Sequence, residues 1–350
     1  MKIAKSFSGE LAVYVSDLDS EHKYTFNSAT PNYLASVTKL FVLIEVMNQV
    51  EQGKLRLDDI VVFRQEDIRD GAGEIKRQAP GTKLTIDDLI EAMVTVSDNS
   101  ATDLLIGQVG IEKINQMIAT AELVGIGEIT TILDIRRRIY AQLDPAGAEL
   151  SPAEIYRLWT LKSQSARARQ LALIVGRNGT PWKQRDLDQA YQAYYQRLIN
   201  SATLDGLGNV FERLSYRDLI GPAVSNRVLE RLLHCRTGPE RIKAGLPTGV
   251  PLAHKTGTQY QRICDAGVVD PNGKRPYVIA ICAKNFSARA SAEQALARIS
   301  KAAYALLGRH PPTDPTNTGD DEMAIQSIDG EPDLIPLATN PRKAGKLHTD

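Results

Sequence analysis

A serine and a lysine three positions apart, Ser36 and Lys39, have the types needed for nucleophilic catalysis. The stretch from Val37 to Val50 is apolar on nearly every side, which predicts a buried helix that begins at this pair. Residues three positions apart share a helix face, so the Lys39 amine can reach the Ser36 hydroxyl. Burial lowers the pKa of a lysine, and the positive end of the helix favours negative charge on the serine. The pattern therefore predicts a nucleophile with its own base.

A second motif, Ser97-Asp98-Asn99, lies where one predicted helix ends and another begins. We expect it to form a loop or short turn that faces the site. A hydroxyl at this position relays a proton between a lysine and a leaving nitrogen, which is general acid–base work.

A third motif, Lys255-Thr256-Gly257, lies on a predicted strand and is followed by Thr258. Its lysine supplies positive charge for a substrate carboxylate, and its glycine lets a substrate backbone approach closely. The backbone amides of Ser36 and Thr258 would then form an oxyanion hole. The three motifs together predict acyl transfer through a serine.

Signatures of other chemistries are missing from the sequence. It has no Gly-x-Ser-x-Gly elbow, no Walker phosphate loop, no Gly-x-Gly-x-x-Gly and no His-Glu-x-x-His. The five histidines have no metal-ligand spacing, so we expect neither a metal nor an organic cofactor. An odd number of scattered cysteines without CxxC spacing predicts reduced, partly buried thiols rather than a disulfide framework or a zinc site. These cysteines are Cys235, Cys264 and Cys282.

The elements that position the motifs include a sheet built from both ends of the chain. Residues 11–18 and 22–26 alternate in polarity and predict a hairpin. Residues 265–270 and 277–283 flank an Asn-Gly pair, which is a strong hairpin signal, and residues 253–258 predict a further strand. Because an isolated hairpin is marginally stable, we expect one antiparallel sheet that contains all of these strands.

Helical patterns fill the middle of the chain. An N-cap pattern begins one helix at Thr85. The fold class is therefore α+β: an antiparallel β-sheet flanked by helices, plus an all-helical lobe. Further helices are predicted over 100–107, 111–122, 151–162, 185–202, 222–235 and 288–307.

The predicted domain organisation is one catalytic domain over residues 1–308 followed by a tail. The sheet lobe would take about residues 1–35 and 240–308, and the helical lobe about residues 36–239. Residues 309–350 contain many prolines and no aromatic residue, which predicts disorder.

Composition limits the classes of partner and location. The 42 Lys and Arg residues balance 42 Asp and Glu residues, so the basic excess of proteins that bind nucleic acid or anionic lipid is missing. No apolar run approaches the ~18 residues that cross a membrane, and residues 1–10 do not form a secretory signal. We expect a small-molecule substrate and a cytoplasmic location, or a periplasmic or secreted one if a leader precedes this sequence.

The three motifs, in this order, resemble the Ser-x-x-Lys, Ser-Asp-Asn and Lys-Thr-Gly set of class A β-lactamases and penicillin-binding proteins. The flanking segments 93–105 and 241–258 are also similar to class A sequence, and the resemblance covers about residues 8–160 and 221–308. It implies a β-lactamase/transpeptidase-like fold with the active site between the sheet and the helical lobe.

The resemblance also implies a role for each motif residue. Ser36 would be the acylated nucleophile and Lys39 the general base. Ser97 would pass the proton to the leaving nitrogen, and Asn99 would hold the amide of the acyl side chain. The substrate carboxylate would be bound by Lys255, Thr256 and Thr258.

The sequence departs from the family at the omega loop. Class A enzymes carry a Glu-x-x-Leu-Asn pattern there, whose glutamate activates the deacylating water, and this sequence has no such pattern. Aligning residues 132–134 with the family's segment places Arg137 about where the glutamate belongs. Since a positioned base is worth ~10²–10⁴-fold, we expect acylation followed by slow hydrolysis. Three nearby carboxylates remain open as substitutes: Asp134, Asp144 and Glu149.

Residues of about 163–219 are extra relative to the family, and the family's N-terminal helix has no counterpart in the sequence pattern. The extra segment caps the site or decorates the surface. Decoration is favoured, because an aromatic stripe at helical spacing more often packs than recognises a ligand. The stripe consists of Tyr191, Tyr194, Tyr195 and Leu198.

The sequence thus predicts a serine hydrolase of the class A β-lactamase type, acylated at Ser36 by a β-lactam or a related amide. A penicillin-binding-like D,D-peptidase or an esterase remains an alternative, since it would use the same acylation set on another substrate. A non-hydrolytic β-lactam- or peptide-binding sensor is the alternative of another class.

Overall fold

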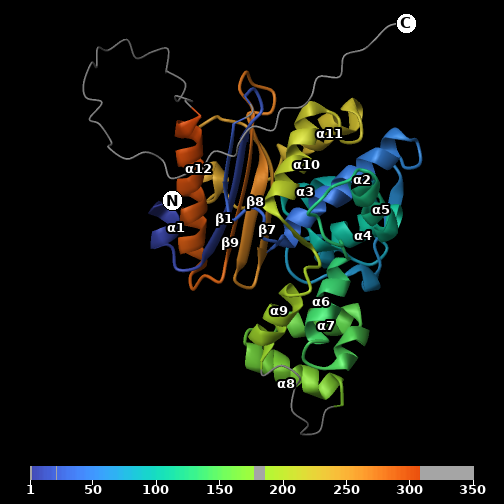
Figure 1. The fold of residues 1–350 in the computed structure, drawn as a ribbon. Helices are drawn as coiled ribbons and strands as arrows, with labels where there is room; N and C mark the ends of the chain where they lie inside the picture. The colour runs from blue at the N-terminus through green and yellow to red at the C-terminus, as the bar shows by residue number, and fades with distance from the viewer. Residues whose placement is uncertain (1, 21, 177–185, 308–350) are drawn as a thin grey trace, which may run out of the picture.

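The central element of the protein is a five-stranded antiparallel sheet in the order β2-β1-β9-β8-β7, shown in Figure 1. The computed structural model describes residues 2–20, 22–176 and 186–307, so the predicted tail over 309–350 lies outside the described residues. The register pairs Glu10 with Lys284 and Asp17 with Tyr277, which confirms that both ends of the chain build one sheet. The strands are β1 (Glu10–Asp17), β2 (Lys23–Phe26), β7 (Leu252–Gln259), β8 (Arg262–Val269) and β9 (Tyr277–Lys284).

Helices cover both faces of this sheet. On one face α12 (Arg289–Leu306) packs on an apolar layer that includes Ile279 and Ile281. A five-residue helix, α1 (Lys2–Ser6), lies beside α12, so the expectation that no N-terminal helix exists was wrong. The opposite face carries small side chains such as Ala266 and Ala280, and it packs against the helical part of the molecule.

Helix α2 (Lys39–Glu51) is the buried centre of the helical part, as its uniformly apolar sequence predicts. The Thr85 hydroxyl accepts a hydrogen bond from the Asp88 amide, and the Thr85 amide donates one to the Asp88 carboxylate, which confirms the predicted N-cap. The helices packed around α2 are α3 (Ile86–Thr95), α4 (Asn99–Val109), α5 (Ile111–Thr120) and α11 (Pro222–Leu232).

A separate group of helices lies at the bottom of Figure 1, with its own apolar core. These helices are α6 (Ile132–Tyr140), α7 (Pro152–Thr160), α8 (Gln164–Ile174) and α9 (Leu187–Tyr195). The tyrosines of α9 pack around Tyr33, whose ring centroid lies 4.7 Å from that of Tyr195. Tyr33 belongs to β3 (Asn32–Tyr33), which pairs with β6 (Ser201–Ala202) and leads directly to the Ser36 segment. The other short pair is β4 (Ile60–Val62) with β5 (Lys83–Thr85).

The predicted helix over 185–202 is shorter than expected, and residue 185 lies outside the described residues. Helix α9 ends at Tyr195 because Leu198 and Asn200 take positive φ angles of 57° and 53°, which a right-handed helix does not allow.

The extra segment does not only decorate the surface. Its last helix, α10 (Leu204–Tyr216), packs against β1, β8 and β9 in the main core. A β carbon at Gly208 would lie 2.2 Å from Tyr14 Cε1, so the helix approaches the sheet closely. This part of the segment is therefore structural core.

The prediction of three reduced cysteines was wrong for two of them. Cys264 and Cys282 lie directly opposite each other on β8 and β9 and form a disulfide, while Cys235 is a free thiol. Pairing of the two strands brings the sulfurs together, although 18 positions separate them in the sequence. Spacing along the chain carries no sign of this contact.

No helix within the described residues is both long and apolar enough to span a membrane.

Candidate active site

Ser36 lies in a 3-10 turn, Ala35–Thr38, between β3 and α2. Its side chain is partly exposed, whereas those of Ala35 and Val37 are buried. Ala35 has a φ of +48°, a strained conformation for a residue other than glycine and one that recurs at functional sites. Neither the turn nor α2 begins with a side-chain capping bond, so the Ser36 hydroxyl is not used as a helix cap. The hydroxyl is held at the surface by a rigid, buried element.

Lys39 is fully enclosed one turn further along, and its ammonium group meets the second motif. It donates to the Ser97 carbonyl, to Ser97 Oγ at 3.1 Å and to Asn99 Oδ1 at 2.8 Å. Burial, together with the positive charge of Lys255, holds the pKa of Lys39 well below its ordinary value, although Asp98 opposes this effect. Lys39 is therefore deprotonated more readily than an ordinary lysine, as a general base requires.

Ser97 joins the second motif to the third. It lies between α3 and α4 with a φ of +61°, which confirms the predicted loop. Its hydroxyl accepts a hydrogen bond from Lys255 Nζ at 3.1 Å, the same distance as from Lys39 Nζ. Burial also lowers the pKa of Lys255. Two cationic side chains from distant segments thus converge on one hydroxyl.

Gly257 lets strand β7 dock against the turn that carries Ser36. A β carbon there would lie 2.0 Å from the Leu34 carbonyl oxygen and 3.2 Å from Ala35 Cβ. No larger residue allows the same approach, so the glycine brings the third motif beside Ser36. The close neighbour here is the protein's own backbone, and the approach of a substrate backbone to Gly257 stays a prediction.

Arg241 supports the same strand and was missed by the sequence analysis. Its buried guanidinium donates to the Gly257 carbonyl at 2.9 Å and to Thr258 Oγ1 at 2.7 Å, and it pairs with Glu293. It adds a fixed positive charge next to the predicted carboxylate-binding residues. An arginine 14 positions before Lys255 gives no local signal of this role.

The loop that carries the second motif is fixed from within. Asp98 caps α4 through the Ala101 amide at 2.9 Å, and its other oxygen accepts the Ile75 amide at 2.9 Å. Asn99 donates to the Asp70 carbonyl at 2.6 Å while it accepts from Lys39. Asp98 therefore caps α4, and the Asn99 side chain is free to connect Lys39 with the backbone at Asp70.

The arginine that faces the motifs is Arg136 rather than Arg137. Arg137 donates to the Leu150 carbonyl at 2.9 Å, away from the motif residues. Arg136 Nε holds both oxygens of Asp70, at 2.7 and 2.9 Å, and its charge helps to lower the pKa of Lys39. A β carbon at Gly71 would lie 2.7 Å from Asn99 Nδ2 and 3.7 Å from Arg136 Nη2, so amide and guanidinium border one small space.

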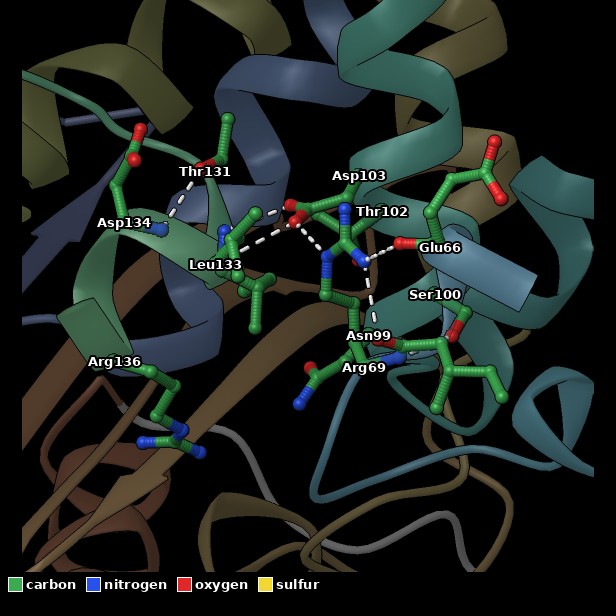
Figure 2. A network of polar contacts seen from close by, with 12 residues as sticks. Glu66, Arg69, Asn99, Ser100, Thr102, Asp103, Thr131, Leu133, Asp134 and Arg136 are labelled. Carbon is green, nitrogen blue, oxygen red and sulfur yellow. Dashed lines mark hydrogen bonds and ion pairs between the residues drawn. The ribbon is translucent and has the colours of Figure 1, made fainter. Parts of the chain in front are cut away.

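Helix α6, which carries Arg136, is anchored to α4 by Asp103, as Figure 2 shows. One Asp103 oxygen accepts the Ile132 amide at 2.7 Å, and the other accepts the Leu133 amide at 3.1 Å and Arg69 Nε at 2.5 Å. These bonds give acceptors to the first backbone amides of α6, which have none inside the helix, and they fix the rotation of α6 about its own axis. The anchor thereby fixes which arginine is presented to the site.

None of the three carboxylates considered as substitutes for the missing glutamate forms a contact with Lys39. Asp134 lies in the first turn of α6 and points away from Asn99 and Arg136 in Figure 2. Asp144 accepts the Ala146 amide at the start of a 3-10 turn, and Glu149 is exposed. The carboxylates whose charges act on Lys39 are Asp98 and Asp103.

The part of the chain that the structure describes contains no group of three or more His, Cys, Asp or Glu side chains arranged to hold a metal. The chemistry that the site can support is acyl transfer through a hydroxyl with a lysine base, with positive charge on both sides.

Comparison with known proteins shows which family this chain is similar to. The model of the "Beta-lactamase enzyme family" matches residues 1–307. The extended-spectrum β-lactamase PER-1 of Pseudomonas aeruginosa is 24% identical over 281 residues, which cover 77% of this chain and 74% of that protein. A β-lactamase of Streptomyces albus G is 24% identical and covers 80% of this chain and 74% of its own length.

Solved structures share the fold at low sequence identity. The β-lactamase of Sphaerobacter thermophilus superposes with a TM-score of 0.65 at 21% identity, covering 88% of this chain and 95% of that one. PBP-A superposes with a TM-score of 0.63 at 19% identity, covering 88% and 94%. The fold class predicted from the sequence is confirmed, and with the family model matched over nearly all of the described residues, the chain belongs to the β-lactamase enzyme family.

Proposed function

We propose that the protein is a serine hydrolase that is acylated at Ser36 by a β-lactam or a related amide. The observation that carries the proposal is the shared contact at Ser97, whose hydroxyl accepts hydrogen bonds from both Lys39 and Lys255. This contact joins the proposed base, the proposed proton relay and the proposed substrate-binding strand, and the base lies three residues after the partly exposed Ser36.

Acylation begins when neutral Lys39 takes the proton from the Ser36 hydroxyl. The lowered pKa of Lys39 gives it a neutral fraction near neutral pH, which an exposed lysine lacks. The Ser36 oxygen attacks the amide carbonyl, and the amides of Ser36 and Thr258 hold the negative oxygen that forms. The proton then passes through the Ser97 hydroxyl to the leaving nitrogen, so the C–N bond breaks and an acyl-enzyme remains.

Residues on both sides of Ser36 are proposed to orient the substrate. Lys255, with Thr256 and Thr258, binds the carboxylate of the substrate, and Arg241 fixes Thr258 from behind. The Asn99 side chain, held by Lys39 and the Asp70 carbonyl, offers its amide to the acyl side chain.

Hydrolysis of the acyl-enzyme is proposed to be slow. Arg136 lies beside Asn99 and is paired with Asp70, where the mechanism of the family would use a free carboxylate to activate water. A guanidinium cannot accept the proton of that water, since its pKa stays far above neutral. The similarity to PBP-A favours this mode, because a solved structure of the PBP-A L158E mutant is an acyl-enzyme complex with penicillin G.

The Cys264–Cys282 disulfide supports an oxidising location. Disulfides persist in the periplasm and outside the cell and are rare in the cytosol. We therefore propose the second of the two locations considered, a periplasmic or secreted one.

The test is intact mass spectrometry after incubation with penicillin, followed by a chase without penicillin. The proposal expects one added penicillin per chain that persists for hours in the wild type and is missing in Ser36→Ala. Rapid loss of the adduct with multiple turnover would indicate an efficient lactamase and contradict slow hydrolysis. An unlabelled wild type that nevertheless binds penicillin reversibly would favour the sensor alternative and refute acylation.

A further inference from the structure

A second cluster of reactive side chains lies next to the carboxylate-binding strand and takes no part in acylation. Cys235 follows α11, His254 precedes Lys255 on β7, and Asp265 lies on β8. The three groups come from separate segments of the chain, yet they form one chain of polar contacts. No step of the proposed acylation needs a thiol at this place.

The geometry of the cluster is that of an activated nucleophile. His254 Nδ1 lies 2.7 Å from Asp265 Oδ1, and both side chains are buried. Asp265 is fixed in turn, because its other oxygen accepts the Ile242 amide at 3.2 Å. The Cys235 thiol hydrogen-bonds to His254 and is itself partly exposed. A nucleophile, a base and a residue that orients the base are thus arranged in sequence.

The charges around this cluster favour the ion pair between the Cys235 thiolate and the His254 imidazolium. Burial alone would lower the pKa of His254, but the Asp265 carboxylate outweighs it and raises that pKa to about 10. Burial alone would raise the pKa of Cys235, but the hydrogen bond and charge of His254, aided by Lys255, lower it to about 6. The thiol is therefore a thiolate at neutral pH, and the thiolate is the reactive form of cysteine.

The thiolate is coupled to the active site by two contacts. Cys235 Sγ lies 3.3 Å from Thr237 Oγ1, and Thr237 shares a short hydrogen bond with Thr256 Oγ1 in the third motif. The negative charge of Cys235 also raises the pKa of Lys255, which favours the ammonium form needed to bind a carboxylate. A change at the sulfur therefore acts on two substrate-binding residues.

We propose that Cys235 is a thiol-modification site: it undergoes exchange with an anionic low-molecular-weight disulfide, and the resulting mixed disulfide slows acylation at Ser36. The second half of this statement rests on the proposed function. The reagent is expected to be anionic because Lys255 and the exposed Arg236 lie next to the thiol.

The exchange is balanced without a further reactant. The Cys235 thiolate attacks one sulfur of the disulfide, a new S–S bond forms, and the bond between the two reagent sulfurs breaks. The Cys235 sulfur is oxidised, and the departing sulfur is reduced and leaves as a thiolate. The product replaces the thiolate charge beside Lys255 by the anionic group of the attached half of the reagent, and it adds bulk beside Thr237.

The first experiment measures exchange kinetics on the folded wild type with the dianionic probe 5,5′-dithiobis(2-nitrobenzoate) between pH 6.5 and pH 8.5. The groups that act on the thiol are His254 and Lys255 on β7, Asp265 on β8 behind His254, and Thr237 on its own loop. With these groups in place the rate should fall less than about 1.5-fold between pH 8.5 and pH 6.5. An ordinary thiol, with a pKa near 8.5, would lose about 50-fold over the same range.

The chain offers a matched control, since Cys264 and Cys282 are joined and Cys235 is the remaining cysteine. Cys235→Ser should release no thionitrobenzoate, and His254→Gln should restore the steep dependence on pH. A folded wild type that does not react, or that reacts with the 50-fold dependence, overturns the modification site without the need for any variant.

The second experiment measures acylation by a fluorescent penicillin before and after Cys235 is converted to the mixed disulfide. The expected result is a loss of at least tenfold in the acylation rate, recovered when a monothiol releases the adduct, and no loss in treated Cys235→Ser. An unchanged rate in the fully modified wild type overturns the coupling to Ser36. If untreated protein is not acylated at all, the proposed function fails, while the exchange kinetics still decide the thiol site on their own.

Discussion

Replacing Lys255 by glutamine should move the pH dependence of acylation, because Lys255 and Lys39 repel each other across Ser97. Each ammonium nitrogen lies 3.1 Å from the Ser97 hydroxyl oxygen, so the two nitrogens are at most 6.2 Å apart, twice that distance. With an effective dielectric constant of about 20, this repulsion amounts to about 2.7 kcal/mol or more. The positive charge of Lys255 therefore lowers the pKa of Lys39, in the same direction as burial does.

The sign of the effect follows from the proposed role of Lys39 as a base. Acylation needs neutral Lys39, so its rate rises with pH until the pKa of Lys39 is passed. Removing the neighbouring charge raises that pKa. The midpoint of the rising limb in Lys255→Gln should therefore lie at a higher pH than in the wild type. The rate at a given pH below both midpoints should be about 100-fold lower, which is the factor that corresponds to about 2.7 kcal/mol.

The assay is the rate of labelling by a fluorescent penicillin over a range of pH. Lys255→Gln also loses a partner for the substrate carboxylate, but this loss lowers the plateau and leaves the midpoint in place. Lys255→Arg is the matched control, because it keeps the positive charge and should keep the wild-type midpoint. A lowered plateau with an unmoved midpoint in Lys255→Gln would show that Lys39 is not the titrating base.

Three further predictions test the nucleophile, the docked strand and the disulfide. Ser36→Ala should abolish covalent labelling and change the free energy of unfolding by less than about 0.5 kcal/mol in a urea titration, since the hydroxyl caps no helix. Gly257→Ala should destabilise the protein by about 1–3 kcal/mol and slow labelling about tenfold or more, because the new β carbon meets the Leu34 carbonyl. Full activity in this variant would mean that β7 need not lie so close to the Leu34 backbone. Loss of the Cys264–Cys282 bond should cost about 3 kcal/mol in the same titration, the value for a loop of this length, and an unchanged midpoint would contradict it.

The sheet could be predicted because each hairpin has a short sequence pattern of its own, and because an isolated hairpin needs further strands to be stable. Alternation over residues 11–18 and an Asn-Gly turn near 272 each indicate a hairpin. Because each hairpin alone is only marginally stable, we expect the two to pair in one sheet. Helix α10 could not be predicted in the same way, because Gly206 and Gly208 lower its intrinsic helix propensity. Its position is fixed by close packing on Tyr14, which only the folded chain reveals.

The motif residues could be located from the sequence because each carries a local pattern, but their neighbours could not. Arg241 and His254 have no pattern of their own, and they act through contacts with strands that are distant along the chain. The disulfide is the clearest case. Cys264 and Cys282 meet only because β8 and β9 pair in one register, and a shift by one residue would turn one sulfur to the other face of the sheet.

The choice between Arg136 and Arg137 shows why an aligned position does not identify a functional side chain. Successive residues on a helix point about 100° apart, so a shift of one position exchanges a side chain that faces the site for one that faces a loop. The rotation of α6 is set by Asp103, which binds the first amides of the helix and belongs to α4, the helix that begins at the second motif. Helix α4 therefore holds Lys39 through Asn99 and orients α6, whose Arg136 charge acts on Lys39. Lys39, the proposed base, and Arg136, the cation proposed to replace the deacylating carboxylate, are thus positioned by one segment, so a change that rotates α6 is expected to alter acylation and deacylation together.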